Sequence, residues 1–116
     1  VALSGGSAGA CTSLWLAFHD EMADPNSPDP VARESTRVLC AAVAGAQTTL
    51  DPHQMREWTP NSRYGSHAFG IVGDAKKKIS SFQMFYDARE RLLPWIKAYS
   101  PYEHVSRGDP SVGLYY

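Results

Sequence analysis

A glycine-rich segment between a strand-like and a helix-like stretch limits the fold of this chain more than any other feature. Residues 5–9 read Gly-Gly-Ser-Ala-Gly, directly after the apolar stretch 1–4. Apolar residues then recur at helical spacing, at Cys11, Leu14, Trp15, Phe18 and Met22. A chain that changes from strand to helix within so few residues needs small side chains, because the two backbones come close. We therefore expect a buried strand, a sharp turn over residues 4–10 and an amphipathic helix.

The rest of the chain continues this alternation of strand and helix. A proline-rich loop over residues 24–30 ends the first helix, since three prolines cannot continue it. The apolar run Val38–Ala46 shows no alternation and is typical of a strand covered on both faces of a parallel sheet. Residues 112–116 are strand-like again. The predicted fold class is therefore α/β, with parallel strands and flanking helices.

The segment between the second and third predicted strands is harder to interpret. Residues 47–75 form an irregular insertion, in which Asp51-Pro52 predicts the start of a short helix, with Asp51 as the cap. Regular spacing returns over residues 76–93, which predicts a helix with Ile79, Phe82 and Tyr86 on one face. Pro94 is expected to end this region.

Composition excludes several classes of function. With 116 residues the chain has room for one domain, and 11 Lys and Arg against 12 Asp and Glu give a net charge of −1. This balance offers no electrostatic footprint for nucleic acid, so the lysines at 76–78 are interpreted as a solvated face. The longest apolar run has nine residues, whereas a membrane-spanning helix needs about 20.

Cysteines and histidines give no further motif. Cys11 and Cys40 are interpreted as two free core thiols, with a disulfide between them or a cysteine nucleophile as alternatives. The four histidines show no zinc-ligand spacing, so no metal or cofactor is expected.

The pattern G-x-S-x-G over residues 5–9 is the candidate for chemistry. A serine on a sharp strand-to-helix turn is an exposed nucleophile, and the backbone N–H of Ala8 in the first helical turn is free to stabilise an oxyanion. We therefore expect Ser7 to be catalytic and Ala8 to supply the oxyanion hole. The alternatives are a loop that allows close packing and a phosphate-binding loop. The dinucleotide pattern G-x-G-x-x-G fails here, and a P-loop lysine is absent.

Gly5–Ala10 resembles the nucleophile elbow of α/β-hydrolase esterases and lipases, particularly the carboxylesterase and hormone-sensitive-lipase-like groups. The stretch 108–116 is similar to the segment that leads into the strand before the catalytic acid of that family. The resemblance implies a partial α/β-hydrolase domain over residues 1–116 that hydrolyses a small-molecule carboxylic ester. It also implies a central fragment of a longer chain, inactive alone, because the catalytic acid and histidine would come from the remainder.

Several alternatives stay open at this point. The order Ser7, Asp51, His104 permits an internal triad, although Asp51 already has a structural role as a helix cap. The insertion at 47–75 resembles a cap over an acyl pocket, but its aromatic side chains have packing as the simpler role. A catalytically silent domain used for binding or assembly is the alternative function, and peptidase chemistry would use the same turn.

Overall fold

The computed structural model describes all 116 residues, which form two compact units. The sheet unit consists of Val1–Thr48 and Pro101–Tyr116, and the helical unit consists of Thr49–Ser100. Every helix in the structure is too short or too polar to cross a lipid bilayer. The two units are described separately below.

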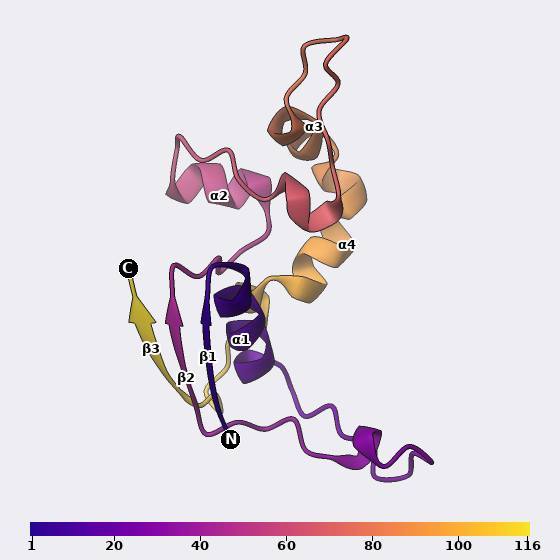
Figure 1. The fold of residues 1–116 in the computed structure, drawn as a ribbon, viewed down its shortest axis with the longest axis vertical. Helices are drawn as coiled ribbons and strands as arrows, with labels where there is room; N and C mark the ends of the chain where they lie inside the picture. The colour runs from indigo at the N-terminus through magenta and orange to yellow at the C-terminus, as the bar shows by residue number, and fades with distance from the viewer. The chain divides into compact units, whose positions relative to one another are not determined.

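The sheet unit contains three parallel strands in the order of the sequence. They are β1 (Ala2–Gly6), β2 (Cys40–Ala44) and β3 (Ser111–Tyr115), with β2 in the middle (Figure 1). Gly6 pairs with Ala44, and Ala44 with Tyr115, so the three strands end level with one another. The predicted α/β class with a parallel sheet is confirmed at this coarse level.

One helix, α1 (Ala8–Phe18), packs against β1 and β2. Its buried face is made of small residues and one leucine, and the core of the unit consists of Ala10, Leu14 and Val43. The predicted face is correct only in part: Leu14 is buried and Phe18 packs against the core, whereas Cys11 and Trp15 lie only half-buried beside it. The reason is that small side chains let the helix axis approach the sheet closely, which bulky side chains prevent. The helix also ends at Phe18, before Met22.

The middle strand is covered on one face only. Ala41 and Val43 are 2% exposed, whereas Cys40, Ala42 and Ala44 on the other face are exposed. The prediction that this strand is buried on both faces is therefore wrong. The apolar run was misleading because the exposed face of the strand carries small side chains, Ala42 and Ala44 beside Cys40, and an exposed alanine costs little hydrophobic free energy. Both cysteines are free, but Cys40 is exposed rather than buried in the core.

A single carboxylate organises the connection between α1 and β2. Glu21 accepts hydrogen bonds from the Ser35 hydroxyl at 2.5 Å and from both the N–H and the hydroxyl of Thr36 at 2.8 Å. It also accepts from the N–H groups of Met22 and Ala23. Led by the Ser35 contact, these hydrogen bonds lower the pKa of Glu21 to about 2. The predicted loop is therefore tied across its base, with the short η1 helix (Val31–Arg33) inside it.

The helical unit contains α2 (Pro52–Trp58), η2 (Ser66–Phe69), α3 (Ser81–Asp87) and α4 (Arg89–Tyr99). Its core is formed by the buried Phe82, Phe85 and Ile96. Phe69 stacks on Phe85 with ring centroids 5.3 Å apart, so this aromatic residue of the insertion serves packing. Trp58 and Tyr64 remain about half exposed.

The predicted helix over 76–93 begins later and continues further than expected. Asp74 and Ile79 pair in a tight turn, so α3 begins only at Ser81, with Ser80 as its cap. Pro94 lies inside α4 instead of ending the region, which contradicts the prediction. Proline removes one helical hydrogen bond, the one to the carbonyl of Glu90, and the exposed surface there allows water to satisfy that carbonyl.

The two connections to the helical unit are each tied to a neighbouring segment. In the sheet unit, the N–H of Tyr102 in η3 (Pro101–His104) donates to the carbonyl oxygen of Thr48 at 2.8 Å. In the helical unit, the N–H of Leu50 donates to the hydroxyl oxygen of Ser100 at 2.8 Å. The chain therefore leaves and returns to the sheet unit through two segments that lie side by side.

Candidate active site at Ser7

Ser7 occupies a strained turn between β1 and α1. Its backbone has φ 53° and ψ −118°, and it is one of two non-glycine residues with positive φ, the other being Lys78. Such a conformation costs about 1–3 kcal/mol and persists only where the surroundings hold it. Here the N–H of Ser7 donates to Ala44 O, and its carbonyl accepts from Cys11 N, both at 3.0 Å. The sharp turn predicted from the sequence is present.

The hydroxyl of Ser7 is not used to cap the helix. A serine at a helix N-terminus ordinarily accepts a hydrogen bond from an N–H two or three residues later. Ser7 makes no such side-chain bond, and the residue is exposed. The side chain therefore does not cap α1, although the backbone is held by two hydrogen bonds.

Gly5 allows the strand to pass close to the helix. A Cβ atom at this position would lie 2.5 Å from the carbonyl carbon and oxygen of Gly9 and 2.8 Å from Ala10 N. These distances are too short for any side chain, so the turn requires glycine at position 5. Gly9 is different, because a Cβ there would meet nothing within 4 Å. The steric reason for small residues thus applies to the first glycine of the motif and not to the second.

The N-terminus of α1 supplies hydrogen-bond donors next to Ser7. The first intrahelical bond runs from Cys11 N to Ser7 O, so the N–H groups of Ala8, Gly9 and Ala10 lie outside the regular helical bonding pattern. The helix dipole also places partial positive charge at this end. Unbonded N–H groups and the helix dipole can both stabilise a negative charge beside Ser7, and the role of Ala8 N–H in an oxyanion hole stays a prediction.

The histidines of the sheet unit lie at the other end of α1. His19 follows the last residue of the helix, and its ring lies 4.9 Å from that of His104, centroid to centroid. Eleven helical residues span roughly 16 Å, so neither imidazole reaches the Ser7 hydroxyl within this unit. The structure therefore does not bring together Ser7 and His104, the nucleophile and base of the internal triad considered above.

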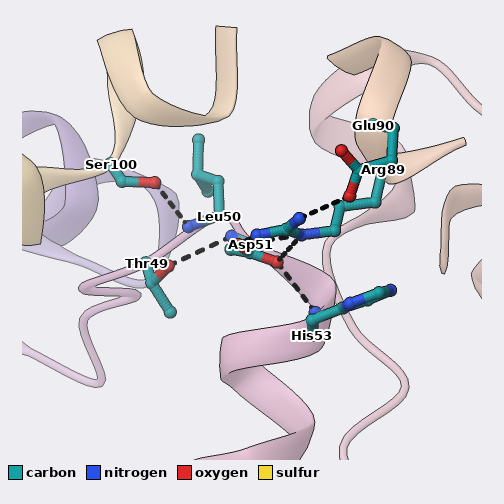
Figure 2. A network of polar contacts seen from close by, with 7 residues as sticks. All are labelled: Thr49, Leu50, Asp51, His53, Arg89, Glu90 and Ser100. Atoms are coloured by element: carbon teal, nitrogen blue, oxygen red, sulfur yellow. Dashed lines mark hydrogen bonds and ion pairs between the residues drawn. The ribbon is translucent and has the colours of Figure 1, made fainter. Parts of the chain in front are cut away.

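Asp51, the other member of that triad, belongs to the helical unit and forms a bidentate ion pair with Arg89. Its carboxylate accepts from Arg89 Nε at 3.0 Å and from Arg89 Nη2 at 2.7 Å, and it also accepts from the N–H of His53 at 2.9 Å (Figure 2). Burial opposes ionisation of Asp51, but the hydrogen bonds from Arg89 and His53 outweigh it and lower the pKa of the carboxyl group. The predicted cap of α2 is confirmed.

The remaining histidines of the helical unit contact aromatic rings. His53 lies on Tyr86 with centroids 4.1 Å apart, and His67 meets Tyr64 edge to face at 4.6 Å. No group of three or more His, Cys, Asp or Glu side chains is placed to hold a metal ion.

The sequence predicted the turn at Ser7 and the cap at Asp51 but not Arg89, the partner of Asp51. Arg89 is 38 residues from Asp51, and no local pattern connects them. The contact of His19 with Trp15 follows helical spacing and could have been predicted, whereas the position of His104 beside them depends on η3.

Comparisons with known proteins found no matching family model, no similar curated protein and no similar solved structure. The site is therefore interpreted from its own geometry.

Proposed function

We propose that Ser7 is the nucleophile of a carboxylic-ester hydrolase of the α/β-hydrolase type, related to carboxylesterases and hormone-sensitive-lipase-like enzymes. The observation that carries the proposal is the combination of a strained backbone with a hydroxyl that makes no capping bond. Strain of this kind persists only where the surrounding structure holds it, and it clusters at functional sites.

The proposed reaction proceeds through an acyl-enzyme. The Ser7 hydroxyl oxygen attacks the ester carbonyl, its proton passes to a histidine, and the N–H of Ala8 stabilises the negative oxygen. The alcohol then leaves with that proton, and a water molecule hydrolyses the acyl group from Ser7. We infer that the histidine and its acidic partner come from a part of the protein outside residues 1–116, since His19 and His104 lie at the far end of α1, and His53 and His67 contact aromatic rings within the helical unit.

The first prediction tests the nucleophile in the complete protein. Ser7→Ala is expected to abolish covalent labelling by a fluorophosphonate probe and to lower the rate of p-nitrophenyl acetate hydrolysis by a factor on the order of 10⁴. Ser4→Ala is the matched control, because Ser4 is an exposed serine on β1, the strand that leads into Ser7. Circular dichroism establishes that both variants are folded.

The outcome also distinguishes the alternative functions. Equal labelling of wild type and Ser7→Ala would contradict the assignment of the nucleophile. No labelling and no hydrolysis by the wild-type protein would instead favour a catalytically silent domain used for binding or assembly. Cleavage of peptide amides as fast as esters would favour peptidase chemistry at the same turn.

A further inference from the structure

A groove of the helical unit lies where α3 meets α4. It has a volume of about 390 Å³, is open to solvent and is lined by Ile79, Met84, Asp87, Ala88 and Arg91. Ile79 belongs to the tight turn before α3, and two backbone hydrogen bonds between Asp74 and Ile79 close the base of this turn. The volume lies at the lower end of the range for ligand pockets, so the groove suits one or two side chains of a partner.

Positive charge predominates in the segment that forms the groove. Residues 74–91 carry five basic side chains against three acidic ones. Arg91 lies on the wall of the groove, and Lys78 directly precedes Ile79 in the chain. Neither Arg91 nor Lys78 forms an ion pair. Both cations are therefore available to a partner that carries carboxylates.

The two carboxylates nearest to the groove are engaged by neighbouring groups. Asp87 accepts a hydrogen bond from the side-chain amide of Gln83 at 2.8 Å. Asp74 accepts from the N–H groups of Lys76 and Lys77, and its carboxylate lies 3.8 Å from the ammonium group of Lys77. Both carboxylates stay negatively charged, and the basic groups of the segment still outnumber the acidic ones by two. The groove thus combines apolar side chains with a net positive rim, which complements an apolar side chain placed between carboxylates.

The loop between α1 and β2 has this opposite character. Residues 20–34 contain five acidic side chains and one arginine, and the loop extends away from α1 and β1 (Figure 1). Val31 lies in this loop, in η1, and is 75% exposed. Asp29 precedes it by two residues, and Glu34 follows it by three. The loop therefore presents an exposed apolar side chain between carboxylates.

The loop is ordered by its own hydrogen bonds. The N–H of Asp24 donates to Ala32 O, and Arg33 Nη1 donates to Ser27 O, both at 2.8 Å. An ordered loop loses less conformational entropy on binding than a flexible one does. The loop can therefore act as a preformed ligand for a complementary groove.

We propose that the groove of one copy of this protein binds the acidic loop of a second copy. Val31 of the second copy occupies the apolar part of the groove, and Asp29 and Glu34 lie near the cations at its rim. Loop and groove are different surfaces, so the contact is heterologous and the copies form chains or rings. One loop in one groove buries little area, so the dissociation constant is on the order of 0.1 mM. The proposal does not depend on the chemistry of Ser7.

Sedimentation of the complete protein tests the contact. The average mass of the wild type is expected to rise between about 10 µM and about 1 mM, and high salt should weaken the association by roughly fivefold or more. Arg91→Glu alters the groove and Val31→Ser alters the loop, so each should weaken self-association at least tenfold. Lys97→Glu and Val105→Ser are the matched controls and should associate as the wild type does, because they change an exposed lysine of α4 and an exposed valine of the sheet unit.

A mixture of the two variants distinguishes a contact between copies from a contact within one chain. Arg91→Glu keeps its loop and Val31→Ser keeps its groove, so an equimolar mixture should form a dimer and nothing larger. A wild type that stays monomeric at about 1 mM, or a mixture that does not associate, would overturn the proposal. Binding of poly-L-glutamate to such a monomer would assign the groove to a different acidic partner. Where circular dichroism shows that Arg91→Glu does not fold, Lys78→Glu takes its place.

Discussion

At the scale of single residues, the strained backbone of Ser7 is expected to lower the free energy of unfolding by a measurable amount. Its φ and ψ are the mirror image of an extended conformation, a region that glycine enters without cost. We expect Ser7→Gly to raise the free energy of unfolding by about 1 kcal/mol, since relief of strain exceeds the greater entropy of the unfolded chain. Urea denaturation measures this change. A less stable Ser7→Gly variant would show that the serine side chain holds the turn.

The two glycines of the motif differ in what they tolerate. Gly5→Ala places a methyl group 2.5 Å from Gly9 backbone atoms and should destabilise the protein by about 3 kcal/mol or prevent folding. Gly9→Ala has free space around the new Cβ and lies in a helix, so it should be neutral or stabilising by up to about 1 kcal/mol. Thermal unfolding of the two variants compares them directly, and equal effects would contradict the geometry of the turn.

The ion pair between Asp51 and Arg89 is the main polar contact of the helical unit. Asp51→Ala removes the bidentate partner of a partly buried guanidinium, which keeps only the exposed Glu90, and it removes the cap of α2, so we expect a loss of about 3 kcal/mol. Glu90→Ala removes the exposed partner of the same arginine and should cost about 0.5 kcal/mol or less. Denaturant titration of both variants measures the difference.

The same pair has a defined dependence on pH. The pKa of Asp51 is lowered in the folded state, so its stabilisation is fully present above the ordinary carboxyl pKa near 4. It is lost as the pH falls through the lowered value. The difference in unfolding free energy between wild type and Asp51→Ala should therefore shrink in acid below about pH 4. A constant difference down to pH 2 would contradict the assignment.

At the scale of elements, the loop that follows α1 depends on one exposed carboxylate. Because hydrogen bonds lower the pKa of Glu21 to about 2, its contacts should persist at pH 3.5, where a free glutamate is mostly protonated. The Thr36 amide should therefore stay protected from hydrogen exchange at pH 3.5 in the wild type and lose protection in Glu21→Gln. Glu34→Gln, an exposed neighbour in the same loop, should behave as the wild type.

Local signals in the sequence predicted the elements that local physics decides. The strand-to-helix turn at Ser7 follows from the steric needs of the chain at Gly5, and the cap at Asp51 follows from its position before Pro52. Burial was predicted less well, because it depends on neighbours that lie far away in sequence. Spacing alone could not show that Ala10 rather than Trp15 faces the sheet, or that Ala42 has no cover.

The same limit applies to the site. The strand-to-helix turn at Ser7 is a local feature and could be predicted, whereas the pairing of Asp51 with Arg89 and of His19 with His104 joins distant segments. Pro94 illustrates the opposite error, since a strong local signal for ending a helix was overridden by packing of Ile96 in the core.

At the scale of the whole molecule, the side-by-side connections bear on how the chain folds. About 66 residues separate β2 from β3, and closing so long a loop is an entropic obstacle to their pairing. If the helical unit folds first, its two ends are already joined through Leu50 and Ser100, and only about 14 flexible residues remain to be closed. The shorter loop lowers the closure cost by roughly 1 kcal/mol. The inserted helices would then act as a folding aid for the sheet, and the order of events along the folding pathway would run from the middle of the chain outward.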